Sequence, residues 1–144
     1  MSVQQISVFL ENKPGTLKKM TGVLAAHGID MRATSLAETK DFGIARLIVD
    51  DALEAVSTLK EHDFVASLTP VLAIEIPDEA GGLDKLLDKF TDESVNIEYM
   101  YAFPGGKNTD RACMIFRVAD TKAAEARLTS AGVKILTQED ISNI

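Results

Sequence analysis

A single cysteine, Cys113, occurs among the 144 residues, so the chain can form neither an internal disulfide nor a metal site built from several cysteines. There are two histidines, and no cluster of histidine and carboxylate residues has the spacing of a metal site. No apolar run approaches the roughly 18 residues of a membrane span, and the N-terminus combines neither a basic segment nor a long apolar run. These absences predict a cytoplasmic protein without a metal centre, a cofactor or a membrane association.

Positive charge is also scarce. The chain has 15 lysines and arginines against 22 aspartates and glutamates, a net charge of −7, and its basic residues form no run. Nucleic acids and anionic membrane surfaces require a basic face, so both are excluded as partners. Hydrophobic residues make up 46% of the chain, which is enough for a folded core. A length of 144 residues permits one ordinary domain or two small ones.

Residue patterns of catalysis are equally absent. No Ser/His/Asp or Cys/His arrangement is suggested by the spacing of the chain. His27 and His62 fall at the ends of predicted helices, where capping is the simpler role, and Cys113 falls in the middle of a predicted strand. The sequence therefore predicts a protein that is not an enzyme.

The first half of the chain alternates between strand-like and helix-like segments. Alternating apolar residues over residues 6–10 are typical of a strand, whereas from Leu17 the apolar residues have helical spacing up to Gly28. The predicted segments are strands at 6–10, 29–38, 44–49 and 64–68, a helix at 16–27, and a second helix from Ala52 with Asp51 as its cap. The resulting order, βαββαβ, is that of the ferredoxin-like unit.

The second half repeats the same order. Gly81 and Asn96 follow Gly15 and Asp30 by 66 residues, and Asp120 follows Asp51 by 69. The predicted segments are strands at 71–76, 95–103, 112–118 and 133–136, with helices at 83–90 and from Asp120 to 131–132. A repeat that keeps its register this well predicts two tandem α+β domains, residues 1–69 and 70–144, each an antiparallel sheet with its helices on one face. Almost no linker separates them.

The third strand of each half is apolar on both faces. In the first half Leu47 and Ile48 point to opposite faces, and in the second half Ile115 and Phe116 do so. Helices can cover one face only, and an exposed apolar sheet is unfavourable. A second layer is therefore expected, either from the other repeat or from a second chain, and we expect a homodimer.

The segment from Glu11 to Leu17 joins the first strand to the first helix. Pro14 suits a first helical turn because it has no N–H group and a fixed φ, and Gly15 allows a tight turn. A helix N-terminus at this point would offer free amides and a partial positive charge to a carboxylate. The simpler interpretation is an ordinary helix start with Asn12 near the cap position.

A set of motifs resembles the ACT domain. The matching residues are Asn12 to Leu17, Gly28-Ile29-Asp30-Met31, Asp41-Phe42-Gly43 and Arg46 to Asp51, and the second half resembles a diverged ACT domain. The chain as a whole is thus similar to small stand-alone tandem ACT proteins without an attached enzyme. The resemblance implies a non-catalytic regulatory or sensor protein. It also implies an amino acid ligand, bound at the turn between the first strand and first helix, at an interface between ACT domains.

The resemblance also implies roles for individual residues. The amides of Gly15, Thr16 and Leu17 would take the ligand carboxylate, and Asn12 corresponds to a ligand-contacting asparagine of the family. Asp30 stands where many members have asparagine; it would suit the ligand ammonium group, or it is a solvated carboxylate at a strand end. The predicted ligand-binding residues are Asn12, Lys13, Pro14, Gly15, Thr16, Leu17, Asp30 and Met31.

The second half lacks several of these features. Asp78 and Ala80 stand at the positions of Asn12 and Pro14, and Asp78 and Glu79 would repel a carboxylate. One full site of this kind per chain is expected. Gly105-Gly106-Lys107 is interpreted as a hairpin loop, because a phosphate loop would be followed by a helix.

A second function is consistent with the same sequence. The ACT pair could act only as an assembly module that docks onto a metabolic enzyme without binding a small molecule. The two functions differ in whether a specific amino acid stabilises the protein against unfolding.

Overall fold

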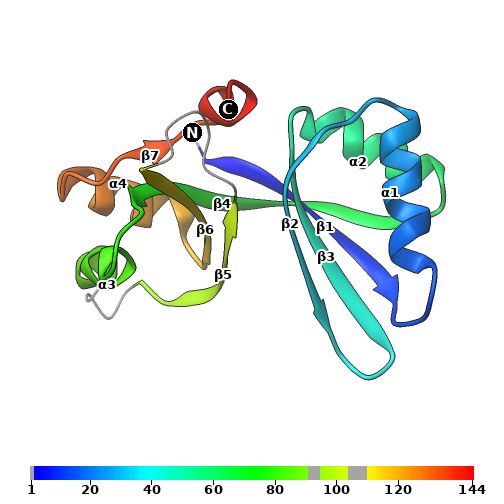
Figure 1. Cartoon of the computed structure of the whole chain (residues 1–144), viewed down its shortest axis with the longest axis horizontal. Coiled ribbons are helices and arrows are strands. Elements are labelled where there is room, and N and C mark those ends of the chain that lie inside the picture. Colours follow the sequence, from blue (N-terminus) through cyan, green and yellow to red (C-terminus); the bar gives the residue numbers. More distant parts are fainter. Residues whose placement is uncertain (1, 91–94, 104–109) are drawn as a thin grey trace. The chain divides into compact units, whose positions relative to one another are not determined.

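A computed structural model describes residues 2–90, 95–103 and 110–144 of the chain (Figure 1). The chain divides into two compact units, Gln4–Thr69 and Pro70–Ile144, the second of which also includes the N-terminal residues up to Val3. The domain limits 1–69 and 70–144 stay a prediction.

The first unit has the order βαββαβ. Its elements are β1 (Val3–Glu11), α1 (Thr16–Ala26), β2 (Met31–Glu38), β3 (Phe42–Val49), α2 (Ala52–Glu61) and the first part of β4 (Val65–Pro77). The strand order is β2-β3-β1-β4, and β3 is antiparallel to both β1 and β2. This confirms the predicted ferredoxin-like unit with an antiparallel sheet.

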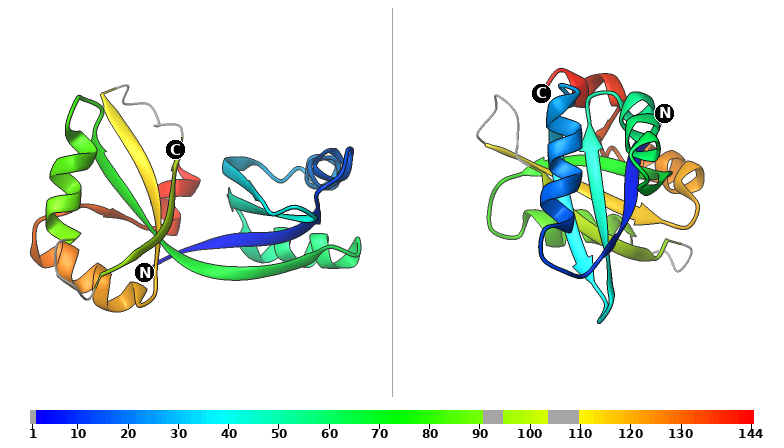
Figure 2. Two further views of the ribbon diagram at one scale, coloured as in Figure 1. Left: turned by 90° about the horizontal axis from the view of Figure 1, so that it is seen from below. Right: turned by 90° about the vertical axis from the view of Figure 1, so that its right-hand side faces the viewer.

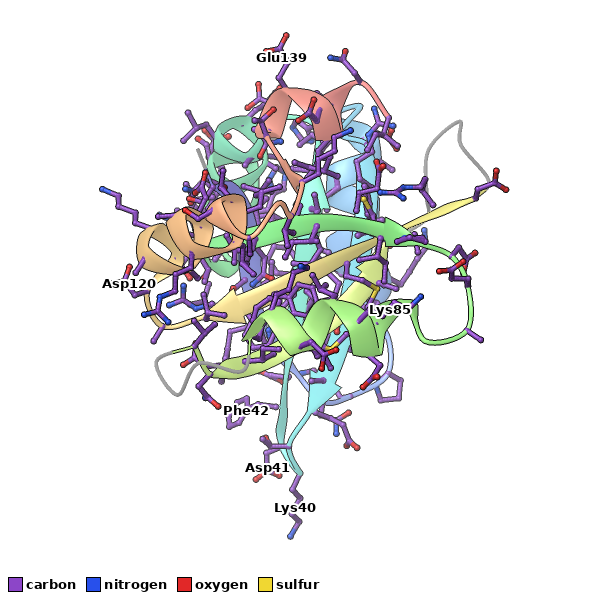
Figure 3. The ribbon with its side chains drawn as sticks, turned by 90° about the vertical axis from the view of Figure 1, so that its left-hand side faces the viewer. Lys40, Asp41, Phe42, Lys85, Asp120 and Glu139 are labelled. Carbon is purple, nitrogen blue, oxygen red and sulfur yellow. The ribbon has the colours of Figure 1, made fainter. Side chains whose placement is uncertain are left out.

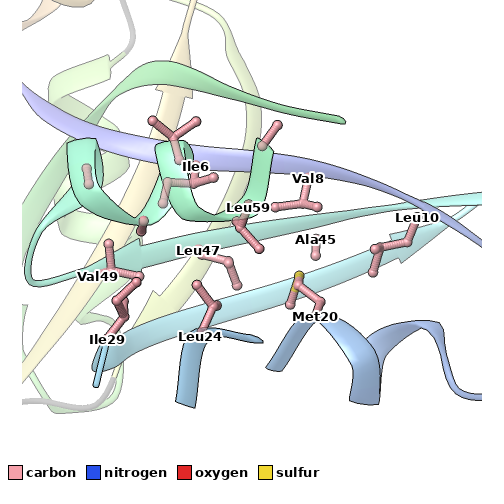
Figure 4. Packing of buried hydrophobic residues seen from close by; sticks show 14 residues of the cluster. Ile6, Val8, Leu10, Met20, Leu24, Ile29, Ala45, Leu47, Val49 and Leu59 are labelled. Atoms are coloured by element: carbon pink, nitrogen blue, oxygen red, sulfur yellow. The ribbon is translucent and has the colours of Figure 1, made fainter. Parts of the chain in front are cut away.

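The core of the first unit lies between its sheet and its two helices. Alternate residues of β1 and β3 point to the helices, and the right-hand view of Figure 2 looks onto this helical face. The buried side chains labelled in Figure 4 are Ile6, Val8, Leu10, Met20, Leu24, Ile29, Ala45, Leu47, Val49 and Leu59. Period-two burial in the strands and helical spacing in α1 therefore bury one continuous apolar layer.

The second unit repeats this topology. After β4 come α3 (Gly82–Leu87), the 3₁₀ helix η1 (Asp88–Phe90), β5 (Ile97–Phe103), β6 (Arg111–Val118), α4 (Thr121–Ser130), β7 (Ile135–Leu136) and α5 (Gln138–Ser142). The strand order is β5-β6-β4-β7, the counterpart of the order in the first unit. Its core contains Leu72, Ile74, Phe116 and Leu128.

Local hydrogen bonds follow the internal repeat. The Asp51 side chain accepts a hydrogen bond from Glu54 N at 3.0 Å at the start of α2, and the Asp120 side chain accepts one from Ala123 N at 3.0 Å at the start of α4. Such caps satisfy amides that have no partner within the helix. The two units thus share both their topology and the way their second helices begin.

Two features differ from the sequence expectation. The predicted strands at 64–68 and 71–76 form one continuous strand, β4, which runs through Thr69 and Pro70. Helix α5 was not predicted from the sequence. A capping box starts this helix, in which Thr137 Oγ1 accepts from Asp140 N at 3.1 Å and Asp140 Oδ2 accepts from Thr137 N at 2.8 Å.

The outer face of the first sheet, opposite its helices, carries the apolar side chains of Phe9, Ile44 and Ile48 beside the polar ones of Ser7 and Arg46, so it is less apolar than the sequence indicated. Ile48 is fully buried, whereas Ile44 is 36% exposed and Phe9 is 46% exposed. A homodimer that covers these exposed side chains stays a prediction. Among the described residues no helix is long and apolar enough to cross a membrane.

Candidate functional site

The β1–α1 turn has a different geometry from the predicted one. Helix α1 begins at Thr16 with Gly15 as its cap, at φ 89°, so Pro14 lies in the turn rather than in the first helical turn. This left-handed conformation favours glycine, because a Cβ atom would be strained there. The cap provides no side-chain hydrogen bond, so the expectation of Asn12 near the cap position was wrong.

Asn12 instead joins the turn to the β2–β3 hairpin. Its backbone N donates to Asp41 O at 2.9 Å, and its side-chain Nδ2 donates to Thr39 O at 3.1 Å and to Lys40 O at 3.4 Å. Figure 3 labels Lys40 and Asp41 at the tip of this hairpin. A ligand contact from Asn12 would therefore fall to its side-chain oxygen, which suits an ammonium group better than a carboxylate.

The remaining polar groups of the turn bond mainly to each other. Thr16 Oγ1 donates to Glu11 O at 2.9 Å, and Lys13 Nζ lies 2.6 Å from Glu11 Oε2. The hydrogen bond and charge of Lys13 lower the pKa of the Glu11 carboxyl. Both side chains of this ion pair are mostly exposed, so the pair contributes little to stability.

A pocket of about 380 Å³ opens beside the turn. The residues that line it are Phe9, Leu10, Glu11, Lys13, Thr16, Lys19, Phe42, Asp63, Phe64 and Val65. The ring centroids of Phe9 and Phe42 are 4.8 Å apart, and Lys19 Nζ lies 5.8 Å from the centroid of Phe64. Aromatic walls with lysine ammonium groups beside them suit a small molecule that has both an apolar part and a carboxylate.

The predicted site residues do not all line this pocket. Lys13 and Thr16 line it, whereas Asn12, Pro14, Gly15 and Leu17 belong to the turn without lining the pocket. Leu17 is 40% exposed at the start of α1. Part of the turn therefore lines the pocket, and the exposed Leu17 lies outside this lining.

Asp30 and Met31 lie at the other end of the first unit. In the sheet Met31 is opposite Val49 of β3, whereas Glu11, at the turn, is opposite Phe42 of β3. At about 3.3 Å per residue, Phe42 and Val49 are roughly 20 Å apart along the strand. No single molecule of amino acid size could touch both ends. One unit therefore does not bring the predicted residues together.

Asp30 already has partners at its own end of the sheet. Its Oδ2 lies 3.4 Å from Arg32 Nε, and its backbone N donates to Asp50 Oδ1 at 3.3 Å. The Asp30 side chain is 60% exposed, and Met31 is 37% exposed. Both could still contact a molecule that approaches from outside the unit.

The sequence analysis missed the aromatic lining of the pocket. Phe9 and Phe42 are brought together by the pairing of β1 with β3, and Phe64 joins them from the segment before β4. An available signal was that Phe9 lies on the face of β1 opposite to the helix-facing Val8 and Leu10. Asp63, which lines the same pocket and has a φ of 66°, was not predicted as a site residue either.

Other candidate residues have structural roles. His27 Nδ1 lies 2.9 Å from Val23 O and His62 Nδ1 lies 2.9 Å from Thr58 O, which confirms that both cap helix ends. Burial raises the pKa of the Cys113 thiol to about 12. Within the described ranges no group of three or more His, Cys, Asp or Glu residues could hold a metal ion. Gly105-Gly106-Lys107 lies outside the described residues.

Comparisons with known proteins agree with this architecture. The family model described as "ACT domain pair" matches residues 1–144. The crystal structure of protein BT0572 from Bacteroides thetaiotaomicron is 37% identical, with a TM-score of 0.91, over 100% of this chain and 98% of that chain. No curated protein sequence matches the chain significantly.

More distant structures share the fold. The ligand-free regulatory subunit of aspartate kinase from Thermus thermophilus is 21% identical, with a TM-score of 0.66, over 92% of each chain. The corresponding subunit from Thermus flavus is 18% identical, with a TM-score of 0.64, again over 92% of each chain. The full-length match to the family model and the two βαββαβ units give the same result: this chain belongs to the ACT domain pair family.

Proposed function

We propose that the chain is a non-catalytic regulatory protein that binds an amino acid at the β1–α1 turn of its first unit. The observation that carries the proposal is the pocket of about 380 Å³ beside this turn, which combines aromatic walls with Lys13 and Lys19. An amino acid has a carboxylate, an ammonium group and a side chain within a few ångströms. Lys13 is paired with Glu11, so Lys19 is the cation that the pocket offers to the carboxylate, and the rings offer apolar surface to the side chain.

The start of α1 adds donors for a carboxylate. The first amides of a helix have no acceptor within the helix, and Gly15 supplies no side-chain acceptor for them. A partial positive charge gathers at the same end of the helix. In this proposal the ligand carboxylate lies at the free amides of the turn, and the rest of the ligand reaches the aromatic walls past Lys13 and Thr16, the two turn residues that line the pocket.

We further propose that a second copy of the chain completes the site. Asp30 and Met31 are too far from the turn to share a ligand with it in one unit, but a symmetric dimer could place them beside the partner's turn. Leu17 and Met31 are 40% and 37% exposed, and such an interface would cover both apolar side chains. In this arrangement Asp30 would face the ligand ammonium group.

The alternative is an assembly module that docks onto a metabolic enzyme. Phe9, Phe42 and Val65 are 46%, 43% and 70% exposed, which is apolar surface that a partner protein could cover. Two of the structures with this fold are regulatory subunits of aspartate kinase. Under this alternative no amino acid would stabilise the protein.

A thermal unfolding screen with the standard amino acids at millimolar concentration separates the two functions. Ligand binding predicts that a specific amino acid raises the Tm, and that the rise grows with concentration. The variant Gly15→Ala should lose this response. Gly81→Ala is the matched control, because Gly81 has the same role at the start of α3, with φ 82° against 89° for Gly15.

The two variants share the same backbone strain, so a difference between them reports on the site. The account requires Gly81→Ala to keep the ligand-dependent rise in Tm. A flat response of the unmodified protein to every amino acid would favour the assembly module.

A further inference from the structure

The second unit contains a pocket that is the repeat counterpart of the one beside the β1–α1 turn. It measures about 240 Å³ and is lined by Glu75, Ile76, Pro77, Gly82, Lys85, Leu86, Lys89, Arg111, Gly132, Val133 and Lys134. Nearly all of these positions follow lining residues of the first pocket by 66 or 69 residues. The internal repeat has therefore preserved a hollow at the same place in both units.

The fold explains this hollow. Ala73 and Ile74 pair with β7, but Glu75 to Pro77 run on beyond β7 and pair only with β6 on their other side. A strand that extends beyond its neighbour leaves an open edge. The first turn of α3 and the segment before β7 form the walls around this edge. The hollow belongs to the second unit alone.

The chemistry of the two pockets is different. Phe9, Phe42 and Val65 of the first pocket are replaced by Glu75, Arg111 and Lys134 at the equivalent positions. The second pocket thus has four basic side chains and one acidic side chain in its lining, within a chain whose net charge is −7. Asp78 and Glu79 are outside this lining, and Glu79 is paired with Lys85 at 3.6 Å, which offsets one positive charge. The remaining excess of positive charge in the lining attracts anions.

Three of the basic groups of the second pocket have contacts within the protein. Arg111 Nε lies 2.9 Å from Glu75 Oε1, and these side chains are 35% and 22% exposed, so Glu75 fixes the arginine in the pocket. A guanidinium has five N–H donors, and the Glu75 contact uses one of them. Lys89 Nζ donates to Ala131 O at 3.3 Å, and Lys85 Nζ lies 3.6 Å from Glu79 Oε1. Figure 3 shows Lys85 on α3.

We propose that this pocket binds a small phosphate-bearing molecule. A held arginine with lysines around it matches the charge and the several acceptor oxygens of a phosphate group. A volume of about 240 Å³ limits the ligand to a small molecule. The site lies in the other unit from the proposed amino acid site, so the chain would respond to two ligand classes.

Calorimetric titration of the whole protein with inorganic pyrophosphate, at constant ionic strength, tests the proposal. Saturable binding at one site per chain is expected. The double variant Lys85→Gln/Lys134→Gln should weaken the affinity about tenfold, because it removes two charge-assisted contacts. The matched control is Lys60→Gln/Lys122→Gln, which removes the same charge from exposed helix positions outside the pocket.

The two double variants distinguish a specific pocket from attraction of the anion by net charge. Retention of affinity in the control together with its loss in the pocket variant supports the site. No saturable binding, or equal loss in both double variants, would overturn it by showing that the anion follows net charge alone. The amino acid response of the first unit is measured separately with Gly15→Ala, so the two proposals fail independently.

Discussion

Arg111 forms an ion pair with Glu75, and the internal repeat places these two residues at the positions of Phe42 and Phe9, whose rings are in tilted contact. The Nε–Oε1 distance is 2.9 Å, and the equivalent ring centroids are 4.8 Å apart. The same neighbouring positions on the first and third strands of each unit are therefore joined by charge in one and by aromatic contact in the other. Because each pair lies in the lining of a pocket, this exchange also sets the chemistry of the two pockets.

The first prediction concerns the coupling between Glu75 and Arg111. A double-mutant cycle with Glu75→Ala and Arg111→Ala should give a coupling free energy of about 0.5–1 kcal/mol, since both side chains are only partly exposed. Urea unfolding at low and high salt measures it, and the coupling should shrink as salt screens the charges. Strict additivity of the two single variants at low salt would show that the ion pair contributes no stability.

The second prediction compares two glycine replacements. A Cβ atom at Gly82 would lie 2.5 Å from Pro77 O, so Gly82→Ala should lower the free energy of unfolding by about 1–3 kcal/mol. A Cβ atom at Gly22, inside α1, would meet no atom within 4 Å, so Gly22→Ala should raise it by about 0.5–1 kcal/mol through helix propensity. Chemical unfolding of both variants provides the comparison. The prediction fails unless the two changes in the free energy of unfolding have opposite signs.

The third prediction concerns the thiol of Cys113. Burial first and the charge of Glu75 second raise its pKa from 9.0 to about 12, and the side chain is 2% exposed. At pH 8 the thiolate fraction would be about one part in ten thousand, so a thiol reagent should react much faster with unfolded than with native protein. The raised pKa also means that stability is lost as pH rises above about 9. Rapid labelling of Cys113 in the native protein at pH 8 would contradict a buried thiol with a raised pKa.

The fourth prediction tests whether two copies build the amino acid site. Gly15→Ala would disable the turn, and Asp30→Lys would disable the contact that Asp30 makes with the ligand at the turn of the other copy. Neither variant alone should therefore bind the amino acid. In randomly mixed dimers about a quarter of all sites would combine two intact halves, and binding stoichiometry should recover to that level. Titration of the mixture measures it. If mixing restores nothing, the turn and Asp30 do not serve one site across a dimer.

The topology could be predicted from the sequence because local signals and the internal repeat agree. Asp51 and Asp120 cap equivalent helices, and Gly15 and Gly81 precede equivalent helices, so the second half supported the order of elements predicted for the first. The start of α1 at Thr16 was predicted correctly, whereas Pro14 was expected in the first helical turn and lies in the turn before the helix. The positive φ of Gly15 ends the turn and places the helix start after it. A sequence indicates such a conformation only as a preference of glycine.

The candidate site was predicted less well, since it depends on register and distance. Phe9 and Phe42 are 33 residues apart, and only the pairing of β1 with β3 makes them neighbours. The separation of Asp30 from Gly15 follows from topology, because β1 and β2 both run antiparallel to β3. The start of β2 therefore lies at the opposite end of the unit from the end of β1, and this could have been deduced from the predicted order.

The most direct measurement of the central claim is a backbone-amide NMR titration with the amino acid that raises the Tm most. The account predicts saturable chemical-shift changes at the amides of Gly15 to Leu17 and at Asp30 and Met31. It predicts none of comparable size at the equivalent Gly81 to Leu83. Shifts confined to the second unit, or no saturable shift at the β1–α1 turn, would contradict an amino acid site at this turn.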